Sequence, residues 1–298
     1  MEFYFQYPDL NGPSGNLLDA GSVTEVAVAV ERHGWHGIAF TEHPAPGSRW
    51  LGAGGHQTLD PFIALAAAGA VTTRIKLLTY LTVVPYRNPL LLAKTAASLD
   101  TVSNGRVVLG AGTGYLKGEF HALGADFDRR NQAIDEVLDV LPLHWSGEPF
   151  SYEGLGFTAR DIQALPMPIQ QPIPIWLGGN SKITLRRIAD RAQGWLPLLG
   201  PPEMANTVRT TYLADFGALS ERIALLREFA GERFAALAIA VTYIDDDLLS
   251  PSPDYERHRD TFGQLEAMGA TQLIVHSRTR PHPWAVEFAE SFATEFIV

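Results

Sequence analysis

Short runs of apolar residues alternate with longer amphipathic segments along the whole chain. The short runs are rich in Ile, Val, Leu and aromatic residues, and they lack the apolar–polar alternation of a strand with one solvated face. This pattern is typical of parallel strands that are buried on both faces. The predicted strands are Phe3–Tyr7, Gly37–Thr41, Ile75–Thr82, Val107–Ala111, Pro174–Leu177, Gly194–Leu198, Leu237–Tyr243 and Gln272–His276.

The segments between these runs carry apolar residues at helical spacing. Examples are Ala20–His33, Pro61–Val71, Leu90–Ser103, Arg130–Leu143, Ile183–Arg191 and Tyr255–Met268. Strand–helix alternation predicts a parallel sheet built from right-handed crossover units. Eight such units in 298 residues fit a closed (β/α)8 TIM barrel, which we expect to form one α/β domain over residues 1–298.

The segment that connects the fourth and fifth predicted strands is longer than the other connections. The segment of residues 146–171 is rich in proline and glycine and predicts an insertion, with a small hairpin around Tyr152–Phe157. Asp245–Pro253 predicts a surface loop because it combines clustered aspartates with alternating serine and proline.

A doubly wound open sheet is the structural alternative. Its glycine-rich dinucleotide motif should follow the first strand, where Pro8–Gly12 offers no match. The glycines of Gly110–Gly118 also fail, because Tyr115 and Lys117 occupy the positions of the third glycine in the two possible registers. The closed barrel is therefore favoured.

The composition of the chain argues against several classes of function. The net charge of −10 and the pI near 5.3 disfavour nucleic acid or an anionic membrane as the main partner. The absence of cysteine excludes disulfides, thiolate nucleophiles and cysteine-ligated metals. Neither a signal peptide nor a long apolar run is visible, so we expect a cytoplasmic protein that acts on a small molecule.

Functional groups of a barrel lie on the loops at the carboxyl ends of its strands. The residues that follow the second to fifth strands are therefore the candidate site. They are Thr41, Glu42 and His43; Tyr80, Leu81 and Thr82; Thr113, Gly114, Tyr115, Lys117 and Gly118; and Gly178, Gly179, Asn180 and Ser181.

His43 is the leading candidate for acid–base or hydrogen-bonding work, because imidazole titrates near neutral pH. Glu42 should point to the opposite face unless the strand has already ended at that position. The alternative is that both residues form a polar strand end facing solvent.

Gly178–Ser181 stands directly before a predicted helix. The two glycines allow the backbone to approach a ligand closely, Ser181 can cap the helix, and the helix N-terminus can bind a phosphate. An ordinary strand-to-helix turn would have the same pattern. Gly110–Gly118 has the same ambiguity, and Lys117 either balances an anionic group or is simply solvated.

Metal and serine-hydrolase chemistry have little support. The nine histidines are scattered and include no His-Glu-x-x-His helix, so we expect no metal. A Gly-x-Ser-x-Gly elbow is also missing from the sequence.

Taken together, five segments in order resemble the luciferase-like monooxygenase superfamily, and more narrowly its branch that uses the deazaflavin coenzyme F420. They are Gly37–Pro44, Thr73–Pro89, Leu92–Gly110, Gly112–Phe120 and Pro174–Ser181, the last followed by Gly194-Trp195.

The resemblance implies a flavin or deazaflavin ring across the mouth of the barrel. It places a non-proline cis peptide at Tyr80–Leu81, with Thr82 beside it, behind that ring. Glu42 and His43 would lie near the ring. The cofactor's side chain and phosphate would contact Thr113, Gly114, Gly118 and Gly178–Ser181. His43, Glu42 and Tyr115 are the implied catalytic residues, with His43 or Tyr115 as proton donor.

Two departures from the family pattern matter. Glu42 stands where the deazaflavin branch usually has Asp, and this variant also occurs among flavin users. Tyr115 stands where the sugar-phosphate dehydrogenases of the family have an acidic residue, and Trp195–Gly200 is apolar where they bind phosphate. We therefore expect an apolar carbonyl or alkene substrate rather than a sugar phosphate.

Three functions remain open from the sequence. The first is F420-dependent hydride transfer. The second is an FMN-dependent monooxygenase that uses O2 and receives reduced flavin from a partner reductase. The third is a non-catalytic flavin-binding barrel. The family resemblance also implies a homodimer.

Overall fold

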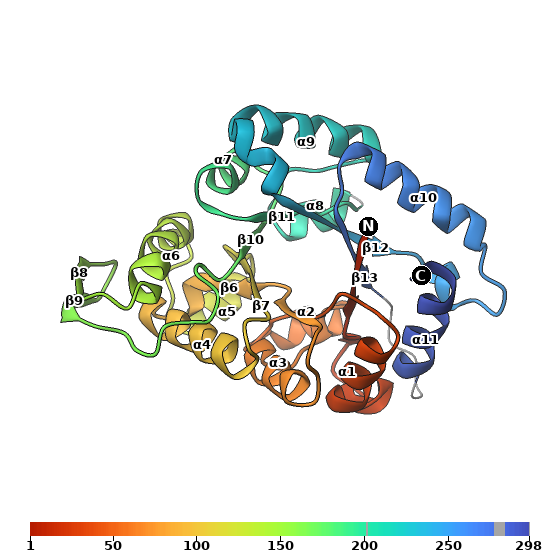
Figure 1. Ribbon diagram of the computed structural model, residues 1–298, viewed down its shortest axis with the longest axis horizontal. Helices are drawn as coiled ribbons and strands as arrows, with labels where there is room; N and C mark the ends of the chain where they lie inside the picture. The colour runs from red at the N-terminus through yellow and green to blue at the C-terminus, as the bar shows by residue number, and fades with distance from the viewer. Residues whose placement is uncertain (201, 277–283, 298) are drawn as a thin grey trace.

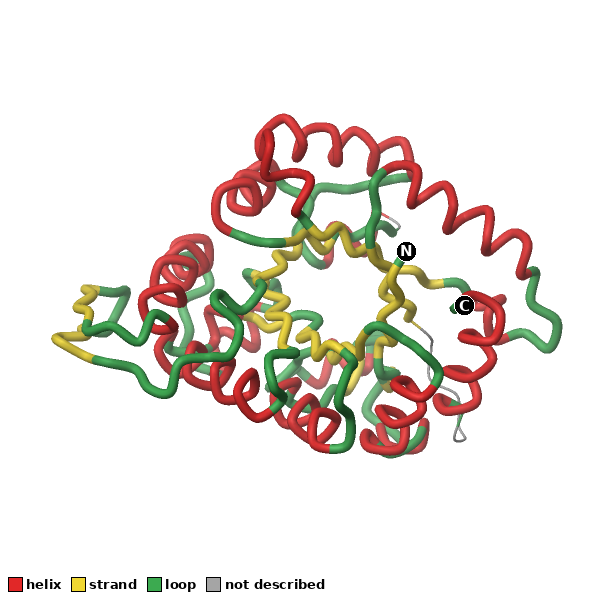
Figure 2. The backbone as a smooth tube through the Cα atoms, in the orientation of Figure 1, coloured by secondary structure: helices red, strands yellow, loops and turns green. Residues whose placement is uncertain are grey.

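The structure is a computed structural model that describes residues 1–200, 202–276 and 284–297. Within these residues, eight parallel strands form a closed ring with helices around it (Figure 2). The ring strands are β1 (Glu2–Gln6), β3 (Gly37–Phe40), β5 (Lys76–Thr79), β7 (Val107–Gly112), β10 (Ile175–Gly178), β11 (Gly194–Leu196), β12 (Ala238–Ile244) and β13 (Gln272–His276). The β10–β7 pairing closes the ring, with Trp176 opposite Gly110. The predicted (β/α)8 barrel is confirmed.

Both faces of the ring strands are apolar, as predicted. One residue from each strand fills the inside of the barrel. These residues are Tyr4, Ala39, Leu78, Val108, Trp176, Leu196, Ala240 and Ile274. Their neighbours along the strands, such as Phe5, Ile38 and Leu77, belong to the larger core cluster that includes the helices. Each continuous apolar run therefore contributes residues both to the barrel interior and to the layer between the strands and the helices.

Helices cover the outside of the ring (Figure 1). They are α1 (Val23–Arg32), α3 (Pro61–Ala70), α4 (Pro89–Val102), α6 (Arg130–Trp145), α7 (Lys182–Arg191), α9 (Phe216–Ala230), α10 (Tyr255–Met268) and α11 (Ala285–Phe296). Capping side chains fix where several helices begin. Ser22 and Glu25 form a capping box on α1, and Asp60 caps α3 ahead of Pro61. Among the described residues, no helix is long and apolar enough to cross a membrane.

The predicted strand Ile75–Thr82 is interrupted. It forms β5 and then β6 (Thr82–Val83), and the two are joined by a cis peptide at Tyr80–Leu81, the position that the family resemblance implies. The Leu81 side chain lies between the ends of β7 and β10. A Cβ on Gly112 would come within 2.5 Å of Leu81 Cδ1, and one on Gly178 within 2.2 Å of its Cδ2.

The predicted insertion is a hairpin of β8 (Phe150–Glu153) and β9 (Thr158–Ile162), which projects away from the barrel (Figure 1). The predicted loop after β12 contains the 3-10 turn η4 (Asp246–Leu249). Shorter elements complete the described chain: β2 (Leu10–Asn11), β4 (His56–Gln57), α2 (Ser48–Gly52), α5 (Lys117–Ala122), α8 (Pro202–Thr207), η1 (Leu17–Ala20), η2 (Val84–Tyr86) and η3 (Gly231–Ala236).

Candidate active site

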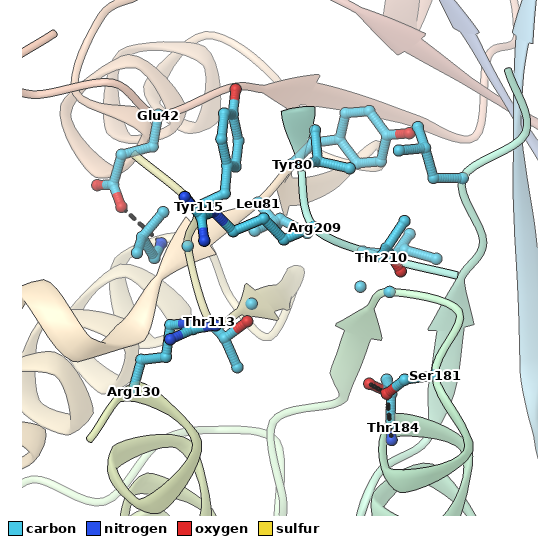
Figure 3. A pocket seen from close by; sticks show the side chains of 18 of the residues that line it. Glu42, Tyr80, Leu81, Thr113, Tyr115, Arg130, Ser181, Thr184, Arg209 and Thr210 are labelled. Carbon is cyan, nitrogen blue, oxygen red and sulfur yellow. Dashed lines mark hydrogen bonds between the residues drawn. The ribbon is translucent and has the colours of Figure 1, made fainter. Parts of the chain in front are cut away.

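A cavity of about 460 Å³ opens at the carboxyl ends of the barrel strands (Figure 3). Most of the candidate residues from the sequence line it: Thr41, Glu42, His43, Tyr80, Leu81, Thr113, Gly114, Tyr115, Gly178, Gly179 and Ser181. Lining residues that sequence reasoning missed include His56, Arg130, Asn131, Thr184, Arg209 and Thr210. The loops after four strands therefore meet in one cavity, as barrel geometry requires.

The structure does not bring three predicted cofactor contacts, Thr82, Gly118 and Asn180, into the cavity lining. Thr82 is fully buried in β6. Gly118 lies on α5, where an added Cβ would meet no atom within 4 Å. The Asn180 side chain is buried and bonds to backbone instead: its Nδ2 donates to the carbonyls of Leu198 and Thr211, each at 2.8 Å. Asn180 therefore fastens the loops beside the cavity.

His43 is held by a buried carboxylate that sequence reasoning missed. Its Nδ1 lies 3.1 Å from Oε2 of Glu119, whose side chain is 1% exposed. The same carboxylate accepts hydrogen bonds from the Ala45 amide at 3.2 Å and the Tyr86 hydroxyl at 3.0 Å. Because Glu119 is itself fixed, it orients the imidazole and leaves Nε2 for the cavity.

Tyr115 lies on the Nε2 side of this imidazole. Its hydroxyl is 3.4 Å from Nε2 of His43. Burial and the nearby carboxylates Glu119 and Asp9 raise the pKa of Tyr115, so the phenol stays protonated at neutral pH and can donate a hydrogen bond.

Glu42 also lines the cavity, because β3 ends at Phe40 and strand alternation no longer applies. Its carboxylate is occupied: Oε2 accepts from the Val83 amide at 2.7 Å and Oε1 from Arg87 Nη2 at 2.5 Å. Burial raises the pKa of Glu42, and the hydrogen bonds from Arg87 and Val83 oppose that rise. These contacts favour a positioning role, in which Glu42 fixes the chain just after the cis peptide.

Tyr80 lines the cavity beside Leu81 and bonds to the Thr242 hydroxyl across the barrel. Burial raises the pKa of Tyr80 to about 12. Leu81, Leu196 and Leu198 contribute apolar surface to the same cavity. This apolar part suits the face of a flat ring.

Cationic and hydroxyl groups gather along the opposite edge of the cavity. Figure 3 shows Arg130, Ser181 and Thr184 there, across from Glu42, Tyr115 and Tyr80. The Ser181 hydroxyl caps α7 by accepting from the Thr184 amide at 3.2 Å, which confirms the predicted cap. The N-terminus of this ten-residue helix opens on the cavity and favours an anion.

Three cations surround the ring of Phe127 beside this edge. Arg130 lies 4.0 Å from the ring centroid, and Lys117 and Arg209 each lie 5.0 Å from it. We call these three residues the Phe127 cation cluster. Arg130 and Arg209 also line the cavity, whereas Lys117 does not. Among the described residues, no ion pair involves a member of this cluster.

Fold and site together define a (β/α)8-barrel protein whose cavity at the carboxyl ends of the strands combines an oriented imidazole, an apolar middle and a cationic edge. The model of the luciferase-like monooxygenase family matches residues 1–244. The chain therefore belongs to this family, as the sequence segments predicted.

Relatives add detail. The chain is 31% identical over 251 residues to an uncharacterised protein of Mycobacterium tuberculosis (strain ATCC 25618 / H37Rv), covering 82% of this chain and 79% of that protein. It is 30% identical over 198 residues to an F420-dependent glucose-6-phosphate dehydrogenase of Microbacterium testaceum (strain StLB037), covering 65% of this chain and 55% of the relative.

Solved structures share the fold. The monooxygenase RslO1 from Streptomyces bottropensis superposes with a TM-score of 0.75 at 19% identity, covering 100% of this chain and 99% of that one. An F420-dependent secondary alcohol dehydrogenase, solved with an F420–acetone adduct, superposes with a TM-score of 0.73 at 16% identity, covering 99% and 98%.

Proposed function

We propose that this protein is an oxidoreductase that transfers a hydride between coenzyme F420 and a small, apolar organic substrate. The observation that carries the proposal is the two-ended cavity, with the His43–Glu119 pair at one end and Arg130, Arg209 and the start of α7 at the other. The relative named as an F420-dependent dehydrogenase supports the choice of cofactor.

The residues present fit a flat cofactor with an anionic tail. Gly112 and Gly178 carry no side chain where Leu81 enters the mouth of the barrel, so the apolar middle of the cavity is left to Leu81 and its neighbours. Ser181, Thr184 and Arg209 supply donors for a phosphate at the cationic edge. When bound, the deazaflavin supplies or accepts the hydride.

Residues of the protein supply the proton that the substrate needs. Reduction of a carbonyl places a hydride on carbon and requires a proton on oxygen. Nε2 of His43 can deliver that proton while Glu119 holds Nδ1 at 3.1 Å. Tyr115, kept protonated by its raised pKa, can donate a hydrogen bond to the same oxygen.

The substrate remains a prediction. Tyr115 and the apolar Leu196-Pro197-Leu198 segment of the cavity wall favour an apolar ketone or enone over a sugar phosphate. The glucose-6-phosphate dehydrogenase relative is the reason to include that sugar in every substrate screen.

An FMN-dependent monooxygenase is the second candidate. Glu42 in place of the usual Asp and the fold likeness to RslO1 favour it. Dependence on O2 separates the two: hydride transfer from F420 proceeds without oxygen, and a monooxygenase stops without it.

The test is a titration of purified protein with F420 and FMN in parallel, followed by fluorescence quenching. We expect micromolar or tighter binding of F420 and at least about tenfold weaker binding of FMN, a difference of about 1.4 kcal/mol. The opposite preference would overturn the F420 proposal. Arg209→Ala removes a cation from the cavity lining, and Arg160→Ala, on the projecting hairpin, is its matched charge control, because Arg160 is exposed and lies on β9 outside that lining.

His43→Ala then tests for catalysis. If cofactor binding survives and every activity of the native protein is unchanged, the barrel only binds its cofactor. A large loss of turnover with cofactor affinity retained supports proton transfer by His43.

A further inference from the structure

A second imidazole lies beside His43 in the cavity. The antiparallel pairing of β4 with β2, which sets His56 opposite Asn11, brings His56 to the mouth of the barrel. The ring centroids of His43 and His56 are 4.9 Å apart and the rings meet edge to face. Trp50 packs against both, at 4.5 Å from His43 and 5.3 Å from His56.

Each imidazole has its own carboxylate. Nε2 of His56 lies 3.8 Å from Oδ2 of Asp9, just as Nδ1 of His43 lies 3.1 Å from Glu119. Asp9 follows β1 and is held in place, since its Oδ1 accepts from the Thr41 hydroxyl at 2.6 Å and its Oδ2 from Gln6 Nε2 at 3.0 Å. The Asp9 side chain is 10% exposed, so solvent screens its charge only weakly.

We propose that His43 and His56, with Glu119 and Asp9 behind them, form a two-imidazole proton relay at the substrate end of the cavity. The proposal rests on the proposed function. As the substrate carbon gains the hydride, its oxygen takes the proton of His43, so an O–H bond forms and an N–H bond breaks. His43 then regains a proton from His56 through a bridging water, and His56 is recharged from solvent at the mouth.

The charges around His56 suit this role. Burial lowers the pKa of His56, and the neighbouring His43 and His276 lower it further, while Asp9 and Glu119 act in the opposite direction. A neutral His56 at pH 7 can accept a proton from solvent and pass it on. Because the two rings are this close, a positive charge on one ring repels a positive charge on the other. The pair therefore holds one proton more readily than two, and that proton can pass between the rings.

The coupling of the two rings can be tested without any cofactor. The Hε1 resonance of His56 is followed by NMR against pH in the native protein, in Asp9→Asn and in His43→Gln. We expect the pKa of His56 to fall in Asp9→Asn, which removes the stabilising negative charge, and to rise in His43→Gln, which removes the repelling neighbour. A titration of His56 that is identical in all three proteins would overturn the relay.

Turnover tests the role of His56 in proton transfer. We expect His56→Gln to lower kcat by about tenfold or more, to alter the pH profile of kcat, and to leave the Kd of F420 unchanged. Imidazole added to the buffer should restore part of the lost rate. His121→Gln, an exposed residue on α5, is the matched control and should behave as the native protein.

An unchanged kcat and pH profile in His56→Gln would refute the relay even if the NMR titrations show coupling. If the native protein turns over no substrate with F420, the proposed function fails instead, and the NMR titrations alone then decide whether the two imidazoles are coupled.

Discussion

The replacement of Glu119 by Gln tests the arrangement around His43 most directly. Gln has nearly the same shape, so the change removes the charge and one acceptor while keeping the volume. In the native structure the carboxylate accepts from His43, from the Tyr86 hydroxyl and from the Ala45 amide. His43 and Tyr86 share Oε2, whereas the Ala45 amide bonds to Oε1. In Glu119→Gln the amide NH2 therefore faces either the Ala45 amide or the His43–Tyr86 pair, and at least one donor loses its acceptor.

The size of the effect follows from burial. Glu119 is 1% exposed, so water does not replace the lost contact. A hydrogen bond to a charged group is worth about 1.5–3 kcal/mol, which corresponds to roughly 10- to 150-fold in kcat/KM if the contact is fully used in the transition state. The unsatisfied donor costs a further 1–3 kcal/mol, roughly, in the free energy of unfolding.

The assay measures kcat/KM and the Kd of F420 on the same preparation, after urea unfolding has shown that Glu119→Gln is folded. Tyr86→Phe is the matched control, because it removes one donor to the carboxylate and leaves the His43–Glu119 contact intact. We expect Tyr86→Phe to lose much less activity than Glu119→Gln. A folded Glu119→Gln protein with native kcat/KM would refute the assignment of an orienting role to Glu119.

Three further predictions concern other parts of the molecule. Arg209→Ala should weaken F420 binding about tenfold, because a charge-assisted contact is lost, and an unchanged Kd in the fluorescence titration would count against the cationic edge as the tail site. Gly110→Ala should destabilise the barrel by about 1–3 kcal/mol or more in urea unfolding, since its Cβ would lie 1.9 Å from the Thr79 carbonyl oxygen; native stability would contradict this clash. Burial and Lys94 lower the pKa of His144 from 6.5, so the unfolded chain binds that proton more readily and stability should fall as the pH drops below 6.5. Unfolding curves at several pH values should show a flatter dependence in His144→Gln, and an unchanged dependence would exclude His144 as a cause.

Much of the barrel could be predicted because its strands are continuous apolar runs. The predicted range Gln272–His276 matches β13, and the other predicted strands differ from the observed ones mainly by residues at their ends. The run Ile75–Thr82 was the exception, since the hydrophobic pattern alone carries no sign of the break at Tyr80–Leu81. Only the family resemblance placed a cis peptide there.

The site was harder to predict because several of its contacts join residues that are far apart in the sequence. Glu119 lies 76 residues from His43 in the chain, on the short helix α5, and no local pattern links the two. His56 reaches the cavity through a two-residue strand that has no hydrophobic signal. Asn180 shows the converse: its position after a strand suggested a ligand contact, but its amide is used to join two loops.

The Phe127 cation cluster has a kinetic consequence for a chain whose net charge is −10. The net negative charge repels an approaching polyanion over a distance of about 10 Å at moderate salt. The cluster attracts negative charge locally. A ligand with one acidic end is therefore oriented by the electric field as it approaches, and it reaches the barrel with the acidic end first. The ligand is therefore oriented during its diffusional approach. Added salt weakens the repulsion by the net charge and the attraction by the cluster together. We expect salt to change the association rate constant less than it changes the fraction of encounters in which the ligand docks in the correct orientation.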